Sequence, residues 1–259
     1  MNRRRFLAGT VGGMSLLAGC NSPSGSADDS KVNVKWPKLT GRARKDWKQT
    51  AKRKKKYPKK AGVVPHERTR IYENRTLQRE VKKKTLGQFD RTLATFFASH
   101  VDLRGFTARL ATADRIAESL LPTFKKEVKE YGITDVREVV PKSPKPNPGK
   151  NTVVYEFEAT YATPEITKRV TIPKIGEQTL TLPADELPIT VLVAVWKEKA
   201  GRAFAAGGAF PAEPYRKSDT ISITGGEGDG IDVTVTLDLG LEPKKLRREI
   251  VDLSGSIRV

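Results

Sequence analysis

The residues best suited to acid–base or metal chemistry are few and widely spaced in this chain of 259 residues. His66 and His100 are the only histidines and lie 34 positions apart, and Cys20 is the only cysteine. Zinc and copper sites need several nitrogen or sulfur ligands, so no spacing here fits either metal. His100 and Asp102 could form half of a proton relay, but no G-x-S-x-G nucleophile motif accompanies them. We therefore expect no catalytic residue, metal or cofactor.

Paired carboxylates and one glycine-rich stretch offer two further kinds of chemistry. Glu156 with Glu158, and Asp232 with Asp238, each share one face of a predicted strand, where two carboxylates could do acid and base work. Solvated strand faces explain the same pattern. Residues 225–230 (GGEGDG) could cradle phosphate or bind calcium, but they match neither a P-loop nor an EF-hand. A glycine-rich hairpin is the favoured interpretation. The chain is not expected to be an enzyme, and an enzyme with an unrecognised site stays an alternative.

Residues 1–19 predict a signal peptide. A short run of arginines precedes Phe6–Gly19, which is a mostly apolar stretch. A membrane-spanning helix needs about 20 apolar residues, so this stretch is too short to span a bilayer. Small residues then lead directly to Cys20, whose thiol could accept a lipid.

This start resembles the signal of twin-arginine-exported prokaryotic lipoproteins. The export motif is carried by Arg3, Arg4, Phe6 and Leu7, and the lipobox by Leu17, Ala18, Gly19 and Cys20. The resemblance implies cleavage before Cys20, a lipid on Cys20, and a location on the outer face of a prokaryotic membrane. It covers only the signal and the lipobox. Such signals are frequent in haloarchaea, although this chain lacks the acidic surface expected of a halophile.

The positive charge of the chain is concentrated in one segment. The formal net charge is +18, and residues 31–84 hold 21 Lys and Arg against four acidic residues. Residues 85–259 hold equal numbers of basic and acidic side chains, so the rest of the chain is neutral. The densest part of the basic segment comprises Lys52, Arg53, Lys54, Lys55, Lys56, Lys59 and Lys60. Like charges at this density repel one another, and the segment has too little apolar surface to offset the entropy lost on ordering. We therefore expect residues 20–64 to form a lipidated, flexible, basic tether.

An anionic surface is the partner that this basic tether suits best. Near such a surface each Lys or Arg contributes about 1 kcal/mol, and the lipid would hold the segment close to the bilayer. An acidic envelope polymer fits on the same Coulombic grounds. Nucleic acid could also be neutralised by these residues, but export makes it the disfavoured partner. A solvated spacer without a partner is the remaining alternative.

Hydrophobic periodicity predicts two helices followed by strands. Apolar residues recur at spacings of three and four from Leu86 to Val101, and again from Ile116 to Tyr131, with Gly132 as a C-terminal cap. Beyond Gly132 the period becomes two. The predicted strands cover residues 136–140, 153–161, 189–196, 202–210, 220–223 and 231–239.

Helices followed by strands predict an α+β fold, with an N-terminal helical pair packed on one face of an antiparallel sheet. The expected domains are a signal peptide (1–19), the tether (20–64) and a single domain (65–259), helical over 66–132 and β-rich over 133–259. The segment Ala200–Ala212 consists largely of small residues with Phe204 and Phe210. It could leave a cavity for a small apolar ligand, although close packing of the small residues against the helices is the favoured interpretation. We expect a surface-anchored envelope lipoprotein with a binding or structural role, and a ligand carrier is the alternative.

Overall fold

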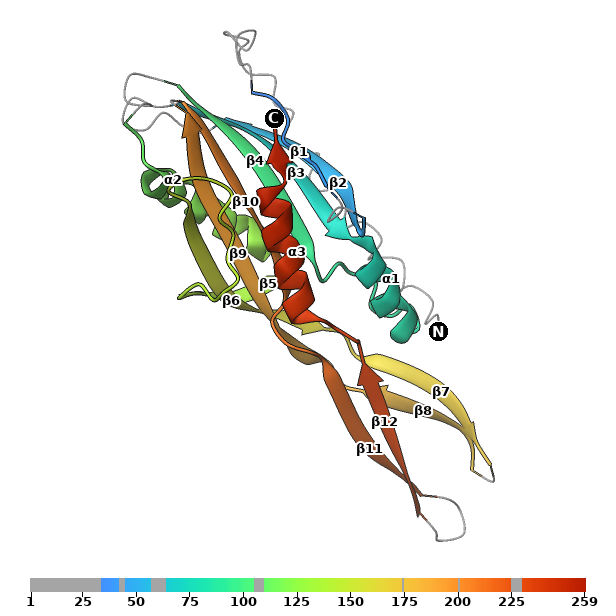
Figure 1. The fold of residues 1–259 in the computed structure, drawn as a ribbon. Coiled ribbons are helices and arrows are strands. Elements are labelled where there is room, and N and C mark those ends of the chain that lie inside the picture. The colour runs from blue at the N-terminus through green and yellow to red at the C-terminus, as the bar shows by residue number, and fades with distance from the viewer. Residues whose placement is uncertain are drawn as a thin grey trace, which may run out of the picture. The chain divides into compact units, whose positions relative to one another are not determined.

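A seven-stranded antiparallel sheet organises the part of the chain that the computed structural model describes, which is residues 34–41, 45–56, 64–104, 110–173, 175–199, 201–224 and 230–259. These residues belong to one unit, Val34–Val259. From edge to edge the strands are β2 (Trp47–Lys56), β3 (Val64–Asn74), β4 (Thr95–Arg104), β10 (Arg202–Pro211), β9 (Asp185–Lys199), β6 (Val153–Thr163) and β5 (Ile133–Val139) (Figure 1).

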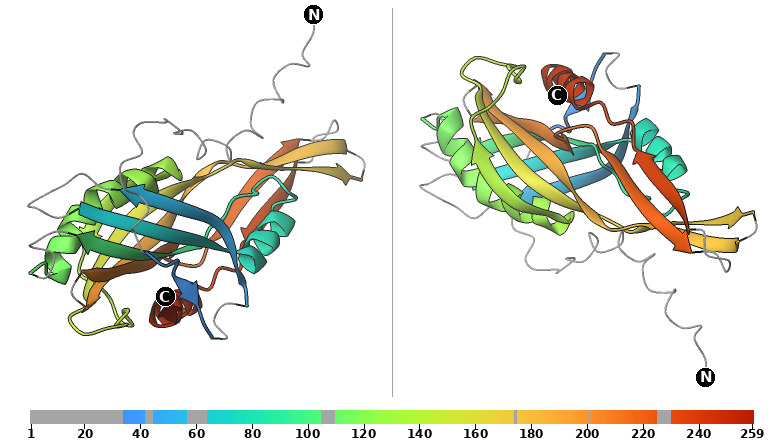
Figure 2. Two further views of the ribbon diagram at one scale, coloured as in Figure 1. Left: turned by 90° about the horizontal axis from the view of Figure 1, so that it is seen from above. Right: turned by 90° about the horizontal axis from the view of Figure 1, so that it is seen from below.

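Helices α2 (Ala113–Glu130) and α3 (Pro243–Gly255) pack on opposite faces of this sheet (Figure 2). On the α2 face, the rings of Phe97 in β4 and Phe124 in α2 lie 5.3 Å apart. On the α3 face, Trp47 donates from Nε1 to Glu249 Oε2 at 2.9 Å. Because successive strand residues point to opposite faces, the central strands must be apolar on both.

Small residues in β10 let its neighbours approach closely. A Cβ added to Gly207 would overlap the carbonyl oxygen of Leu192 in β9, and one added to Gly208 would overlap that of Thr95 in β4. Ile250 of α3 also lies against Gly208. The neighbouring strands and α3 therefore pack closely against the small-residue stretch and leave no cavity beside these glycines.

Two hairpins extend the sheet beyond β6, β9 and β10 (Figure 1). One pairs β7 (Ile166–Ile172) with β8 (Gly176–Leu182), and the other pairs β11 (Arg216–Thr224) with β12 (Gly230–Asp238). The Gln88 side chain fastens the first hairpin, because it accepts from the Thr167 amide at 2.9 Å and donates to the Thr167 carbonyl at 2.7 Å. The remaining elements are α1 (Arg75–Lys84), β1 (Lys38–Leu39) and β13 (Ile257–Arg258).

The expected α+β fold, with a helical pair on one face of the sheet, is wrong. The described chain is mostly β, and its three helices include a C-terminal one. Residues 86–101, expected to be a helix, instead form a loop followed by β4. Phe96 and Phe97 are adjacent in β4 and point to opposite faces, both covered by other parts of the fold. Two apolar faces thus produced spacings that mimic a helix.

Other sequence predictions are confirmed. Residues 116–131 fall in α2 and its C-cap, and Gly132 follows with a φ of 80°, a conformation that glycine adopts without strain. All six predicted strands are present, as β5, β6, β9, β10, β11 and β12.

The structure also differs from the expected tether in the part of it that is described, residues 34–41 and 45–56. Trp47, the first residue of β2, is 3 % exposed, and Val34 and Leu39 are buried. The folded unit therefore begins at Val34 and not at residue 65. An edge strand can keep alternate lysines in solvent, so the charge density that favoured a flexible segment is compatible with a strand.

Candidate anionic-surface interface

Strand alternation divides the basic run on β2 into two sets with opposite environments. Lys52, Lys54 and Lys56 are exposed, whereas Arg53 and Lys55 are half-buried on the other face. Lys59 and Lys60, which the sequence analysis assigned to the same contact, lie outside the described residues. Within the described run, the exposed lysines are the ones free to meet a large partner.

Arg53 and Lys55 hold β2 against α2 through one carboxylate. Arg53 Nη1 lies 3.3 Å from Glu127 Oε2, and Lys55 Nζ lies 3.1 Å from Glu127 Oε1. Arg53 Nη2 also donates to the Tyr131 hydroxyl at 2.7 Å. Burial raises the pKa of Tyr131, so this phenol stays neutral near pH 7. These two cations are therefore structural.

Strand β3 adds two half-buried arginines beside the exposed lysines. The antiparallel register places Lys52 opposite Arg70 and Lys54 opposite Arg68. We call Lys52, Lys54, Lys56, Arg68 and Arg70 the basic face. Residues on one strand face repeat every ~6.7 Å, and neighbouring strands lie ~4.8 Å apart, so the five side chains start from a regular grid. Among the described residues, none of the five is paired with a carboxylate.

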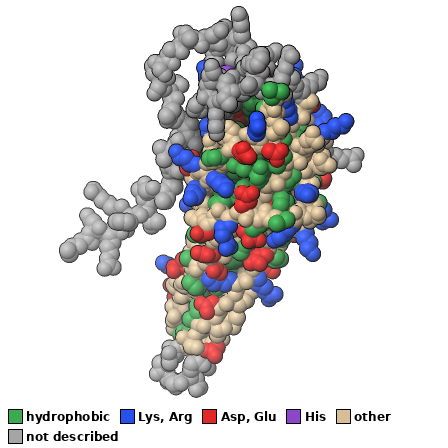
Figure 3. Space-filling view, turned by 90° about the vertical axis from the view of Figure 1, so that its left-hand side faces the viewer, with side chains coloured by type: hydrophobic (Ala, Val, Ile, Leu, Met, Phe, Trp, Pro, Cys, Tyr) green, Lys and Arg blue, Asp and Glu red, His purple; other side chains and the backbone are tan. Residues whose placement is uncertain are grey.

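The other side of the domain has a different charge pattern. Figure 3, which looks at the side that lies to the left in Figure 1, shows basic and acidic side chains interspersed. This mixture agrees with the equal numbers of basic and acidic residues beyond residue 84. The basic face is thus a local feature and does not reflect a uniformly basic domain.

A short N-terminal segment, residues 34–39, lies against the basic face. The Trp36 ring centroid is 5.7 Å from Lys52 Nζ and 5.4 Å from Arg68 Cζ, which are cation–π distances. The Lys35 carbonyl lies 2.9 Å from His100 Nδ1. Leu39 pairs with Ile257 in the β1–β13 ladder. The chain therefore enters the folded unit at the basic face.

His100 has a structural environment. Its ring stacks on Phe204 at 5.0 Å, and Phe204 stacks on Trp196 at 5.3 Å. Burial is the main cause that lowers the pKa of His100, so the ring is neutral near pH 7. The Lys35 contact helps to hold residues 34–39 on the sheet, and the aromatic stack gives His100 a structural role.

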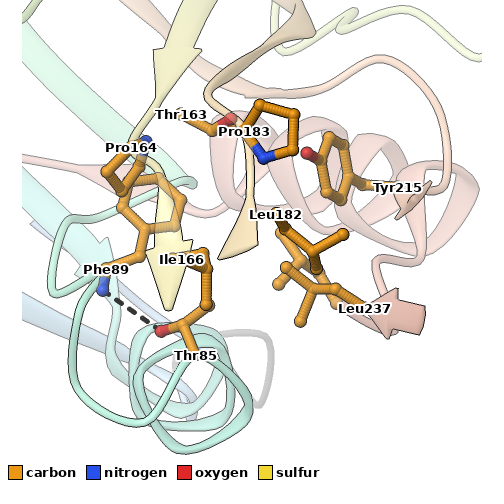
Figure 4. A pocket seen from close by; sticks show the side chains of 10 residues that line it. Thr85, Phe89, Thr163, Pro164, Ile166, Leu182, Pro183, Tyr215 and Leu237 are labelled. Atoms are coloured by element: carbon orange, nitrogen blue, oxygen red, sulfur yellow. Dashed lines mark hydrogen bonds between the residues drawn. The ribbon is translucent and has the colours of Figure 1, made fainter. Parts of the chain in front are cut away.

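The alternative of a ligand cavity beside Phe204 and Phe210 is wrong, because protein occupies this space. Phe204 lies in the aromatic stack, and Phe210 is 2 % exposed in the core. A small pocket lies elsewhere, at the base of the hairpins, where Phe89, Leu182 and Tyr215 contribute to its wall (Figure 4). Its volume of about 10 Å³ has room for about one water molecule.

The carboxylate pairs identified in the sequence have partners within the fold. Glu158 Oε1 lies 3.4 Å from Lys142 Nζ, Asp232 accepts from the Ser222 hydroxyl at 2.5 Å, and Asp238 accepts from the Gly240 amide at 2.7 Å. In the part of the chain that the structure describes, no three His, Cys, Asp or Glu side chains cluster in a way that could hold a metal ion. Each of these carboxylates is therefore held by a neighbouring residue of the fold.

Glu156 is clamped by Arg247, a residue that the sequence analysis did not identify. Arg247 donates to the two Glu156 oxygens at 3.0 and 2.6 Å. It also donates to the carbonyls of Pro144 and Lys142, so α3 fixes the proline-rich loop after β5. The signal for α3 was Pro243 at its first position, with Leu246, Ile250 and Leu253 one helical turn apart.

Several predicted features fall outside the described residues. They are the export residues Arg3, Arg4, Phe6 and Leu7, the lipobox with Cys20, and residues 225–229 of the glycine-rich stretch. None of the helices in the described ranges is long and apolar enough to cross a membrane.

The comparisons with known proteins identify a family. Neither the curated proteins nor the solved structures include a match. One family model, a domain of unknown function called DUF6517, matches residues 39–258. The match includes β2 and all of the basic run, which places them in the family's domain. It also includes α3, the helix that the sequence analysis missed. This chain belongs to the DUF6517 family.

Proposed function

We propose that this protein is an envelope lipoprotein, anchored through a lipid on Cys20, whose basic face contacts an anionic membrane or an acidic envelope polymer. One observation carries the proposal. Alternation on β2 and β3 gathers Lys52, Lys54, Lys56, Arg68 and Arg70 on one face, with no paired carboxylate among the described residues.

The affinity of the basic face for an anionic surface is electrostatic, and it acts only at short range. Each basic residue close to an anionic membrane contributes about 1 kcal/mol. The Debye length falls from about 10 Å at 0.1 M salt to about 3 Å at 1 M, so the contact weakens as salt rises. A lipid on Cys20 would supply the anchoring that this reversible contact lacks.

Protection of the sheet edge is the competing explanation for the lysines. β2 is an edge strand, and lysines on such strands discourage pairing between molecules. This explanation predicts aggregation when the lysines are removed and no affinity for anionic surfaces in the intact protein. The two explanations therefore differ in a binding experiment.

The test uses the mature chain from residue 20 onward with Cys20→Ser, so that no lipid contributes. This protein should sediment with vesicles that contain anionic lipid or bind an acidic polysaccharide, and release as the salt concentration is raised. Lys52→Gln/Lys54→Gln/Lys56→Gln should abolish binding. The matched control changes the three exposed lysines 82–84 at the end of α1 to Gln, which alters the net charge equally. Equal loss in both variants, or no binding by the parent chain, would refute the proposal.

Anchoring and export are tested in cells with the full-length chain. Cys20→Ser should move the protein from the membrane to the soluble fraction in high salt. Arg3→Lys/Arg4→Lys should block twin-arginine export, because an ammonium does not replace a planar guanidinium. Unchanged membrane sedimentation of the first variant in high salt would contradict lipidation, and normal export of the second would indicate the general secretory route.

A further inference from the structure

We propose that the partner of the basic face is the phosphate-bearing headgroup layer of the membrane that holds the anchor, with Trp36 at headgroup depth and both hairpins in solvent. This inference rests on the proposed function and goes further, because it selects the membrane over a polymer and assigns an orientation.

The short length of chain between the anchor and the domain favours the membrane as the partner of the basic face. Fourteen residue steps separate Cys20 from Val34, the first residue of the folded unit. A fully extended chain covers at most about 3.5 Å per step, which limits this distance to about 50 Å. The bilayer is therefore always within reach of the domain.

The point at which the chain enters the domain decides which surface meets the bilayer first. Residues 34–39 lie against the basic face, where Trp36 contacts Lys52 and Arg68. An anchor attached through this segment draws the basic face toward the membrane. The position of the anchor would not bring a free polymer closer to the basic face.

Trp36 has the chemistry of an interfacial residue. Indole rings collect at headgroup depth because they combine an apolar body with one N–H donor. Trp36 is half-buried, whereas Trp47 and Trp196 are only 3 % and 6 % exposed. Of the three tryptophans in the chain, Trp36 is therefore the one positioned to enter a headgroup layer.

The hairpins lie at the end of the sheet opposite Lys56, and they lack the net positive charge that would attract them to an anionic membrane. Lys56 of the basic face lies level with the start of β10, because the strand register pairs Lys56 with His66, His66 with Asp102, and Asp102 with Arg202. The β11–β12 hairpin follows the opposite end of β10, about 30 Å away at about 3.3 Å per residue. The four hairpin strands carry four basic and four acidic residues. An anionic membrane therefore favours the basic face over the hairpins.

The experiment uses native tryptophan fluorescence of the mature Cys20→Ser chain at low salt. Vesicles containing anionic lipid and a headgroup-attached quencher should reduce the fluorescence and shift the emission to shorter wavelength. Trp36→Phe should lose that response and still sediment with the vesicles through the five cations. Vesicles without anionic lipid serve as the control.

A second label reports on the hairpins. Because Cys20 is the only cysteine, Thr234→Cys in the Cys20→Ser chain gives a single labelling site on an exposed position of β12. A fluorophore there should not be quenched by the headgroup quencher. Quenching of this label without quenching of Trp36 would overturn the orientation while leaving the proposed function intact.

The choice of membrane over polymer is tested by competition. The lipidated wild-type chain on anionic vesicles should keep its Trp36 quenching when excess acidic polysaccharide is added at low salt. Loss of quenching under these conditions would show that the polymer is the preferred partner, which overturns the inference and keeps the proposed function. No binding to either partner would refute both.

Discussion

Arg247 in α3 and the lysines of β2 are cations in opposite situations. The Arg247 side chain is surrounded by acceptors from Glu156, Pro144 and Lys142 and is largely buried. Lys52, Lys54 and Lys56 are exposed to solvent. A buried cation that donates to several acceptors holds the fold together, while exposed cations without carboxylate partners remain able to bind. Position in the fold, and not residue type, decides which role a cation has.

The largest expected effect comes from breaking the buried pair. Arg247→Met should lower the free energy of unfolding by about 3–5 kcal/mol, because it leaves the Glu156 carboxylate buried without a cation and with only the Lys142 amide as a donor. Glu156 is 1 % exposed, so water cannot compensate easily. Urea unfolding followed by circular dichroism measures the change.

The control for this prediction removes both charges. Arg247→Met/Glu156→Leu should be more stable than Arg247→Met alone, since a buried ion pair can often be replaced by apolar residues at little cost. A single variant that loses less than about 1 kcal/mol would show that the clamp is not structural.

The next largest effect concerns His100, whose neutral form the fold prefers. Its pKa is lowered by burial and by Arg202, which outweigh the opposing effects of the Lys35 carbonyl, Asp102 and Glu198. The unfolded chain therefore takes up a proton near about pH 6.5 while the folded chain does not. Stability should be complete above that pH and fall as the pH drops toward the folded pKa, by at most about 1.4 kcal/mol per pH unit.

The measurement compares unfolding free energies of wild type and His100→Gln from neutral to mildly acidic pH. Glutamine cannot titrate but keeps a donor for the Lys35 carbonyl. Their difference should shrink as pH falls. A difference that is constant with pH would mean that His100 titrates alike in both states.

The sequence could predict those elements whose hydrophobic pattern has one clear period, and also β9, whose unbroken apolar run indicates a strand covered on both faces. β6 and β12 alternate clearly, and α2 has one apolar stripe, so each was found. β4 was mistaken for a helix because both of its faces are covered, and the sequence alone cannot show which distant residues cover them. The same applies to Arg53 and Lys55, because their partner Glu127 belongs to α2, far along the chain from β2. In each of these cases the environment of a residue depends on partners that are distant in the sequence.

A smaller effect should follow from the paired cations of β2. Arg53→Gln removes a half-buried contact with Glu127 and a donor to Tyr131, so it should cost about 0.5–1 kcal/mol. A double-mutant cycle with Glu127→Gln measures the coupling directly. Zero coupling energy would mean that these half-buried cations contribute no more than the exposed lysines.

The smallest effect on stability is expected for the basic face itself. Lys52→Gln/Lys54→Gln/Lys56→Gln changes three exposed side chains without carboxylate partners among the described residues, so the unfolding free energy should stay within about 0.5 kcal/mol of wild type. Relief of repulsion with Arg68 and Arg70 acts in the stabilising direction. The same variant should lose binding to anionic vesicles. Loss of binding together with unchanged urea unfolding would show that these lysines form an interface. A loss of stability as large as that expected for Arg247→Met would show that they are structural, as Arg247 is.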